Sequence, residues 1–316
     1  MIRNYIKVLF RRIKKNKGFA LLNMFGLSLG LSAAVLILLW IQDEVSYNRF
    51  NDKYDDLYQV MGNQKYDAKT YTFAATPGLL ADAMKSDFPE VVNTARMSWG
   101  DSWLFTVNEK SLYESGNYAD PAFFRMFSFE KRYGDLNNPF PDDNSIVLTE
   151  KMAIRYFGTA NVVGKTIRAN KTDELKITAV VADPPPNSSI KFNWLVSFHV
   201  FEERNDWLKS WTNNGIQTYV ELKPGTDYKT FNKKYYGYIK SKNPDAAAMP
   251  LLLAMDDWRL RNAFEEGVQT GGRIEYIGLF MVIAILLIII ACINFMNLAT
   301  ARSEQRAKEV GVRKVM

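Results

Sequence analysis

FALLNMFGLSLGLSAAVLILLWI (residues 19–41) and IGLFMVIAILLIIIACINFMNL (residues 277–298) are the two stretches that decide the fold, and neither contains a charged residue. Each run of about 22 residues is roughly 33 Å long as a helix, and the hydrocarbon core of a bilayer is about 30 Å thick. Core helices of soluble proteins rarely extend this far without a charge. The two runs therefore predict two membrane-spanning helices.

The flanks of the first run distinguish a retained anchor from a cleaved signal peptide. Its basic start is typical of a signal peptide, but the run is too long for one. It also continues into Gln42, Asp43 and Glu44 without a small-residue cleavage site. We therefore expect an uncleaved anchor.

The net charge of +6 is concentrated at the two ends of the chain. Seven cations precede the first run, and the residues after the second run carry +3, which leaves the segment between the runs at −4. Because cytoplasmic flanks are rich in Lys and Arg, both ends are expected inside and the middle outside. The acidic middle also argues against a nucleic-acid partner, despite the pI near 9.1.

Between the runs, segments of helical and strand period alternate, which predicts a membrane protein of the α+β class with a mixed α/β outer domain. We expect helices at residues 47–58, 76–88, 121–126, 149–157 and 227–239. We expect strands at residues 57–61, 145–148, 165–167, 174–182, 192–198 and 216–222. Thr76 is the predicted N-cap of its helix, because Pro77 follows it.

These elements divide the chain into five segments. We expect residues 1–17 to form a basic amphipathic helix at the cytoplasmic membrane surface, with an ordinary basic flank as the alternative. Residues 18–42 are the first span, and residues 43–272 are the outer domain. Residues 273–301 form a stalk and the second span, and residues 302–316 are cytoplasmic.

Small and polar residues inside the spans are candidates for helix packing. Gly26 and Gly30 form a G-x-x-x-G pattern, which allows another helix to approach closely. Asn294 and Asn297 lie in the second run, where an amide seeks a partner on another helix or reaches interfacial water. Both interpretations of the asparagines remain open.

No residue pattern predicts an enzyme, a metal site or a cofactor. GTANVVGKT (residues 158–166) has five residues between its glycines where a phosphate-binding loop needs four, so it predicts a turn before a strand. His199 is the single histidine and Cys292 the single cysteine, so no zinc cluster is expected, and His199 is interpreted as structural. The adjacent pairs Asp142–Asp143 and Asp256–Asp257 are interpreted as solvated loop residues.

Six segments together resemble one family. They are KGFALLNMFGLSLGLSAAVLIL (17–38), TPGLLADAMKSDFPEV (76–91), YADPAFFRMFSF (118–129), SIVLTEKMAIRYFG (145–158), VGKTI (163–167) and NFMNLATARSEQRAKEVGVRKVM (294–316). The combination resembles the MacB-like, FtsX-related permeases of ATP-binding-cassette (ABC) transporters, the type VII class, in their Bacteroidetes-type form. The resemblance implies a periplasmic MacB-like domain with a porter-like lobe and a small β-rich lobe.

The resemblance also implies a function. It suggests a non-enzymatic permease subunit of the bacterial inner membrane that couples ATP hydrolysis by a cytoplasmic ABC ATPase to motion of its periplasmic domain. That motion serves efflux, lipoprotein or peptide handling, or mechanotransmission. The implied partners are the ATPase, a second permease copy or homologue, a periplasmic adaptor or outer-membrane protein, and the lipid bilayer.

Residues 304–314 are the ATPase-coupling segment that the resemblance implies. Glu309, Gly311, Arg313 and Lys314 match the family pattern E-x-G-x-R-K, and Glu304 belongs to the same segment. The bare residues also fit a basic flank that meets anionic lipid. Family permeases continue into further spans, so a multi-pass protein of which this is the N-terminal portion is expected.

A two-span sensor of chemoreceptor or histidine-kinase type is the alternative, because it also holds an outer ligand domain between two spans. A sensor would enter a helical signalling linker with heptads after its second span. This chain instead reads KEVGVRK there, which favours the permease.

Overall fold

The computed structural model describes residues 17–315, with the side chains of residues 24–297 described throughout. The amphipathic helix predicted at residues 1–17 lies outside this description, apart from the backbone of Lys17. The described chain forms two compact units. The two-helix unit joins the part of the chain up to Val45 to the part from Arg273 onward, and the outer domain is Ser46–Gly272.

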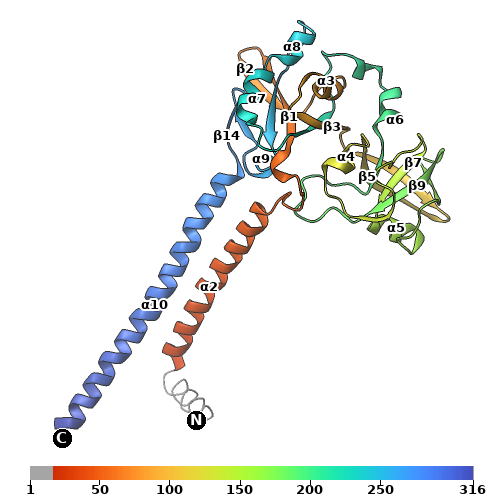
Figure 1. The fold of residues 1–316 in the computed structure, drawn as a ribbon. Helices are drawn as coiled ribbons and strands as arrows, with labels where there is room; N and C mark the ends of the chain where they lie inside the picture. The colour runs from red at the N-terminus through yellow and green to blue at the C-terminus, as the bar shows by residue number, and fades with distance from the viewer. Residues whose placement is uncertain (1–16, 316) are drawn as a thin grey trace. The chain divides into compact units, whose positions relative to one another are not determined.

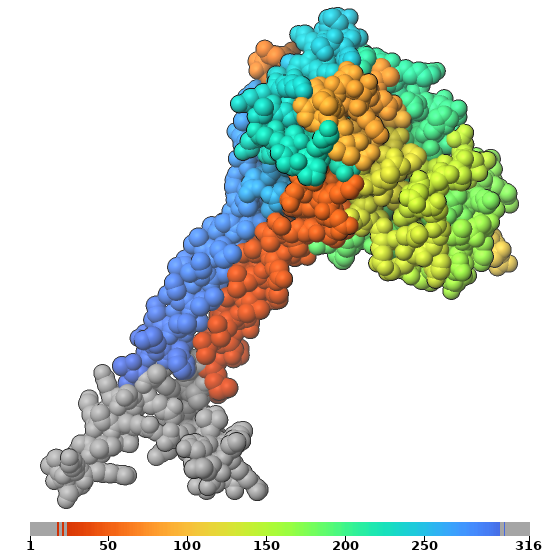
Figure 2. Space-filling model, viewed as in Figure 1, coloured from red at the N-terminus to blue at the C-terminus, as the bar shows by residue number. Residues whose placement is uncertain are grey.

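The two-helix unit consists of α2 (Lys17–Val45) and α10 (Arg273–Val315), which lie side by side (Figures 1 and 2). Both predicted spans are confirmed as helices, and the windows Met24–Val45 and Arg273–Asn297 are long and apolar enough to cross a membrane. Only 11% and 17% of these windows are buried. The exposed remainder is mostly Leu, Ile, Val and Phe, which is a surface suited to lipid rather than water.

The outer domain is built around a sheet of twelve strands. Those strands are β1 (Leu57–Tyr66), β2 (Lys69–Phe73), β3 (Val91–Met97), β4 (Asp101–Val107), β5 (Lys110–Ala119), β6 (Lys131–Gly134), β7 (Ser145–Thr149), β8 (Thr166–Ala169), β9 (Asp173–Val181), β10 (Trp194–Ser197), β11 (Gln217–Leu222) and β12 (Met249–Ala254). A separate hairpin follows, made of β13 (Ala263–Glu265) and β14 (Val268–Gly271).

Short helices join and cover these strands. They are α3 (Leu80–Asp87), α4 (Phe123–Met126), α5 (Glu150–Phe157), α6 (Phe198–Glu203), α7 (Tyr228–Tyr235), α8 (Tyr238–Lys242) and α9 (Asp257–Leu260), with 3-10 turns at Tyr54–Asp56 and Asp206–Lys209. The first turns of several helices have a side-chain cap. Thr149 accepts from Met152 N at the start of α5, and Asp227 accepts from Lys229 N at the start of α7.

Six strands close on themselves and form the first lobe. The pairing order is β10-β7-β9-β8-β4-β5, and β5 pairs again with β10 in parallel through Trp194↔Gly116. The ring encloses a core in which Trp103 and Trp194 stack with their ring centroids 4.2 Å apart. Gly116 has to be a glycine, because an added Cβ would lie 2.3 Å from the Trp194 ring.

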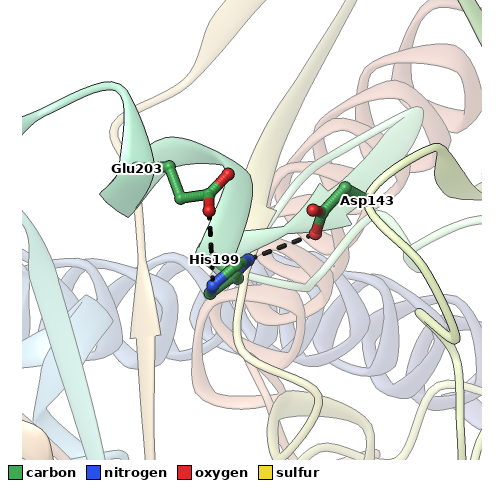
Figure 3. Close-up of side chains that lie close together, drawn as sticks. All are labelled: Asp143, His199 and Glu203. Carbon is green, nitrogen blue, oxygen red and sulfur yellow. Dashed lines mark hydrogen bonds and ion pairs between the residues drawn. The ribbon is translucent and has the colours of Figure 1, made fainter.

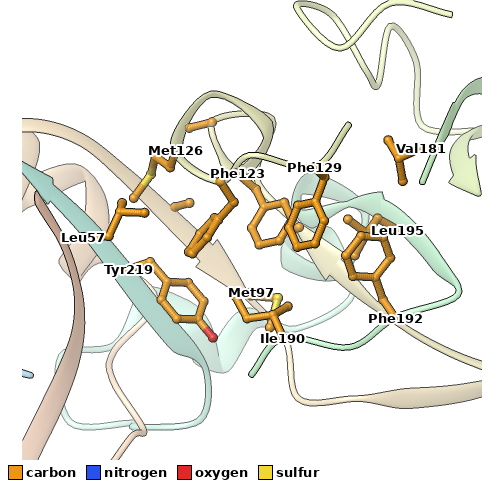
Figure 4. Close-up of a cluster of buried hydrophobic side chains, with 14 of the residues drawn as sticks. Leu57, Met97, Phe123, Met126, Phe129, Val181, Ile190, Phe192, Leu195 and Tyr219 are labelled. Carbon is orange, nitrogen blue, oxygen red and sulfur yellow. The ribbon is translucent and has the colours of Figure 1, made fainter. Parts of the chain in front are cut away.

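The second lobe is an open sheet of strands β3-β11-β1-β12, with β2 added to the end of β1. Its helices α3, α7 and α8 contribute Met84, Tyr235 and Ile239 to a core on one face of this sheet. The two lobes also share a third core, shown in Figure 4, to which Leu57, Met97 and Tyr219 come from the open sheet and Val181 and Leu195 from the ring. This shared core makes the outer domain one body.

Most of the predicted outer elements are confirmed, but the single helix predicted at residues 227–239 is two helices, α7 and α8, and two further details are wrong. The helix predicted at residues 47–58 is absent, because α2 ends at Val45 and Asn48 takes a left-handed φ of 62°. The Asn48 side chain instead donates to Ser189 Oγ (2.9 Å) and accepts from Ser189 N (2.8 Å). These long-range bonds hold the segment in turns. A helix at this position would break them.

The predicted N-cap at Thr76 is the second error. The helix α3 begins only at Leu80, and Thr76 pairs with Ile216 in an isolated antiparallel bridge. Its hydroxyl lies 3.0 Å from Ile216 O and 2.7 Å from Thr218 Oγ1. Thr76 therefore pairs with Ile216, the residue before β11, instead of capping the helix.

Candidate functional site

The glycines predicted to pack helices lie in the contact between α2 and α10. A Cβ added to Gly26 would lie 2.9 Å from Asn294 Nδ2, and one added to Gly30 would lie 3.0 Å from Ala291 Cβ. Asn294 is half-buried there, whereas Asn297 is exposed. The two glycines thus leave the space into which the second helix fits.

The opposite end of the helix pair holds a charged contact. Arg273, the first residue of α10, donates to Glu44 Oε1 across 3.1 Å. The Glu44 side chain is only 4% exposed, while that of Arg273 is 47% exposed. Trp40 and Phe280 pack edge to face next to this end, with ring centroids 5.1 Å apart. A charged group and two aromatic rings at this position are typical of a membrane boundary.

The predicted coupling residues lie on the last turns of α10. The backbone of Glu304, Glu309, Gly311, Arg313 and Lys314 is helical and continuous with the second span. Their side chains lie outside the described part of the structure. The structure thus places the segment at the end of a single helix that begins at Arg273.

The outer domain contains a buried charge network that the sequence did not indicate. Arg96 on β3 donates to both carboxylate oxygens of Asp120, from Nε (3.0 Å) and from Nη2 (3.1 Å). Its Nη1 donates to Glu202 on α6 (2.9 Å), and its guanidinium lies 4.4 Å from the centre of the Phe198 ring. The network ties β3 of the open sheet to α6, which follows β10 of the ring.

The protonation of Arg96 follows from its partners. Burial opposes its charge, but the hydrogen bonds and charges of Asp120 and then Glu202 outweigh burial and raise the pKa of Arg96. Arginine is charged in any case, so Arg96 is a permanent cation between the lobes, whereas burial raises the pKa of its partner Asp120. A lone arginine in a strand carries no local pattern, which is why only the folded arrangement identifies it.

His199 is exposed and belongs to a cluster of charged side chains (Figure 3). Its Nδ1 lies 3.1 Å from Asp143 Oδ1, and its Nε2 lies 3.9 Å from Glu203 Oε1. The hydrogen bond to Asp143 is the main cause that raises the pKa of His199. The interpretation of His199 as a structural residue stays a prediction, because the side chain has a carboxylate partner but lies on the surface.

The geometry of this cluster suits an ion-paired imidazolium better than a metal site. Ligand atoms of Asp143, His199 and Glu203 lie within 4.8 Å of one another. The two carboxylates, however, approach opposite nitrogens of the ring. A metal ion binds one ring nitrogen, so the three groups do not converge on one position without rearrangement.

The other rejected motifs have structural explanations. In the segment from residue 158 to 166, Gly158 caps α5 with φ 74° and Gly164 turns with φ 85° before β8 starts at Thr166, which confirms the predicted turn and strand. Asp142 and Asp143 are exposed loop residues, as predicted, whereas Asp256 is partly buried and Asp257 is buried, contrary to the prediction. Asp142 accepts from Ser145 Oγ (2.9 Å), and Asp256 accepts from Tyr54 Oη (2.7 Å).

Comparison with solved structures shows a likeness in fold. A domain of a candidate permease from Porphyromonas gingivalis matches with a TM-score of 0.56 at 21% identity, over 65% of this chain and 92% of that one. The periplasmic region of MacB from Actinobacillus actinomycetemcomitans matches with a TM-score of 0.47 at 14% identity, over 64% and 90%. The extracellular domain of the noncanonic ABC-type transporter YknZ from Gram-positive bacteria matches with a TM-score of 0.47 at 12% identity, over 62% and 99%.

A search of the curated proteins found no match. The family described as the MacB-like periplasmic core domain matches residues 20–234, which include most of the first apolar helix and most of the outer domain. The match covers more than half of the chain. It includes both a membrane-spanning helix and the folded domain that follows it. The chain therefore belongs to the family of membrane proteins with a MacB-like periplasmic core domain.

Proposed function

We propose that the chain is the permease subunit of an ABC transporter in the bacterial inner membrane. In this proposal a separate cytoplasmic ATPase hydrolyses ATP, and the resulting movement of the spans is passed to the periplasmic domain. The chain itself performs no covalent chemistry. Its motion serves efflux, the handling of lipoproteins or peptides, or the transmission of force to a periplasmic partner.

The observation that most supports this proposal is the continuity of α10. One helix runs from Arg273, two residues after β14 of the outer domain, through the apolar span and on to Val315. It contains no proline, so its hydrogen-bonded ladder has no built-in kink. The E-x-G-x-R-K residues lie near its end, where a docked ATPase would act on the helix.

The surface of the helix pair supports an association with a second permease copy or homologue. Leu29 and Leu36 on α2 and Leu286 and Ile290 on α10 are exposed within the described unit. Such surfaces face lipid or a further helix, and small residues such as Ser28 and Ser32 favour close helix approach. A periplasmic adaptor or outer-membrane protein would complete an efflux assembly.

The test uses the complete permease that carries this chain, reconstituted with its ATPase in proteoliposomes. Replacing Glu309 and Arg313 with alanine is expected to abolish the stimulation of ATP hydrolysis by the permease, while the outer domain stays folded. Arg302→Ala is the control, because it removes a charge from the same helix before the coupling segment begins. Equal effects of the variant and the control would refute the coupling assignment.

Purification from native membranes separates the permease from a sensor. Mass spectrometry of the co-purifying proteins is expected to find an ABC ATPase, and a periplasmic adaptor beside it would favour efflux. Recovery of a kinase or receptor-signalling protein in place of the ATPase would overturn the proposal.

A further inference from the structure

An open groove on the outer domain carries aromatic rings on one wall and uncharged polar groups on the other. Its volume is about 560 Å³, within the roughly 300–1,000 Å³ of small-molecule sites. One wall is the β1–β2 hairpin, through Gln64, Tyr66 and Phe73. The other is the segment before β11, through Trp207 and the residues from 212 to 214.

The aromatic wall follows from the strand period. In the register of the hairpin, Gln64 faces Tyr71 and Gly62 faces Phe73, so Tyr66, Tyr71 and Phe73 all lie on one face. Tyr66 and Phe73 line the groove, and Tyr71 lines a neighbouring hollow. Such a face usually packs onto a core, but these rings are 55%, 48% and 41% exposed. They contact one another at centroid distances of 6.2 to 6.3 Å and form a continuous aromatic surface.

The polar wall is held in place and exposes Thr212 and Asn213 to the groove. Trp207 donates through Nε1 to Asn205 Oδ1 (2.9 Å), and its ring lies so close to Gly215 that an added Cβ there would be 2.5 Å away. Asn213 donates to Trp207 O (3.2 Å). Asn214 Oδ1 is shielded from solvent and has no hydrogen-bond partner among the described residues. Because that oxygen is closed to solvent, Thr212 and Asn213 are the polar residues of this wall that a ligand can reach.

The chemistry of the groove restricts the ligand. None of the residues that line it is charged, so an ionic ligand would lose its hydration without a counter-charge. Polar and aromatic groups alternate around it, so a purely apolar molecule would bury amides without partners. Addition of a peptide strand to β2 is also disfavoured, because Thr70 N on that strand already donates to Glu266 Oε2 (2.9 Å).

We propose that this groove binds a neutral saccharide chain. A pyranose ring has a flat C–H face that stacks on an aromatic side chain and a rim of hydroxyls that donate to and accept from amides. The aromatic hairpin would supply the stacking surface. Thr212 and Asn213, which are exposed in the groove, would exchange hydrogen bonds with the sugar hydroxyls. This site is independent of the ATPase coupling proposed above, since binding requires no partner protein.

The test is a binding titration of the full chain in nanodiscs of phosphatidylethanolamine and phosphatidylglycerol. Sugar-headed detergents are left out, because their headgroups would compete. Two neutral probes are followed by saturation-transfer NMR, chitotetraose and maltotetraose. Saturable binding of either supports the proposal. Binding of chitotetraose alone indicates a cell-wall type of N-acetylated glycan, and binding of both indicates general recognition of sugar rings.

Matched variants locate the site. Tyr66→Ser is expected to weaken binding about three- to tenfold, because it removes one stacking ring. Tyr113→Ser, which removes a 71% exposed ring from β5, is expected to leave binding unchanged. Unchanged circular dichroism of both variants excludes misfolding. The proposal is overturned if neither saccharide binds at millimolar concentration, if a neutral peptide competes the saccharide away, or if Tyr113→Ser weakens binding as much as Tyr66→Ser.

Discussion

The carboxylate of Glu44, next to the end of α2, accepts a 3.1 Å hydrogen bond from the guanidinium of Arg273, the first residue of α10. The acid is almost fully buried and the base is half-exposed. Two helices that enter the outer domain from opposite ends of the sequence are therefore joined by a charged contact at the same level. That position makes the contact a determinant of how the helices pair.

We expect Arg273→Ala to destabilise the helix pair by about 1–3 kcal/mol, because a buried carboxylate loses a charged donor. Unfolding of the full chain by detergent titration in bicelles measures the loss. A double-mutant cycle with Glu44→Gln isolates the pair. A coupling energy within about 0.5 kcal/mol of zero would show that the two residues act independently.

A larger side chain at Gly30 is expected to destabilise the contact between α2 and α10. Gly30→Leu would place a side chain where Ala291 Cβ already lies 3.0 Å from the added Cβ, so the helices must separate. We expect a loss of about 1–3 kcal/mol in the same assay. Gly278→Leu is the control, because an added Cβ at Gly278 has no atom within 4 Å among the described residues. Similar losses for both would mean that leucine acts through something other than this contact.

Removal of the Arg96 side chain is expected to destabilise the outer domain strongly. Arg96→Met would leave Asp120 and Glu202 without their shared cation, and we expect a loss of about 3–5 kcal/mol in denaturant unfolding followed by tryptophan fluorescence. Arg168→Met removes a cation from an exposed pair with Glu174 and is expected to cost under about 1 kcal/mol. Adding Asp120→Asn to Arg96→Met should restore part of the loss. Without that recovery, the arginine would matter for its packing rather than its charge.

His199 predicts a pH dependence. As the single histidine, it can be followed by NMR without assignment, and its pKa is expected above 6.5 because of the hydrogen bond to Asp143. Asp143→Asn should lower that pKa. The sign follows from linkage: the pair stabilises the fold fully below the unfolded pKa of about 6.5, and the contribution is lost as pH rises through the folded pKa. An unchanged pKa in Asp143→Asn would show that the hydrogen bond does not form in solution.

The sequence predicted elements whose residues carry their own local signals. The strand from residue 145 and the helix after it are confirmed because the hydrophobic period changes at Thr149, which also caps the helix. The two spans were equally clear, since an uncharged run of that length has few alternatives. The glycines of the helix pair followed from small-residue spacing, although only the structure shows that Gly26 faces Asn294.

What the sequence could not predict depends on residues far apart in the chain. The segment after α2 has helical composition, but bonds between Asn48 and Ser189, 141 residues away, hold it in turns. The polar strand β5 lacks an apolar run and is ordered by closure of the six-stranded ring. The ion pairs of Arg96 form only when folding brings Asp120 and Glu202 next to it.

The length of α10 has a mechanical consequence. At 1.5 Å per residue, its 43 residues form a rod of about 64 Å, so a tilt of about 5° about one end would carry the other end through roughly 6 Å. Such a lever arm amplifies a small change of angle into a displacement larger than one helical turn. The amplification depends only on unbroken helix, so a single proline placed midway along α10 would shorten the arm while leaving both of its ends chemically intact.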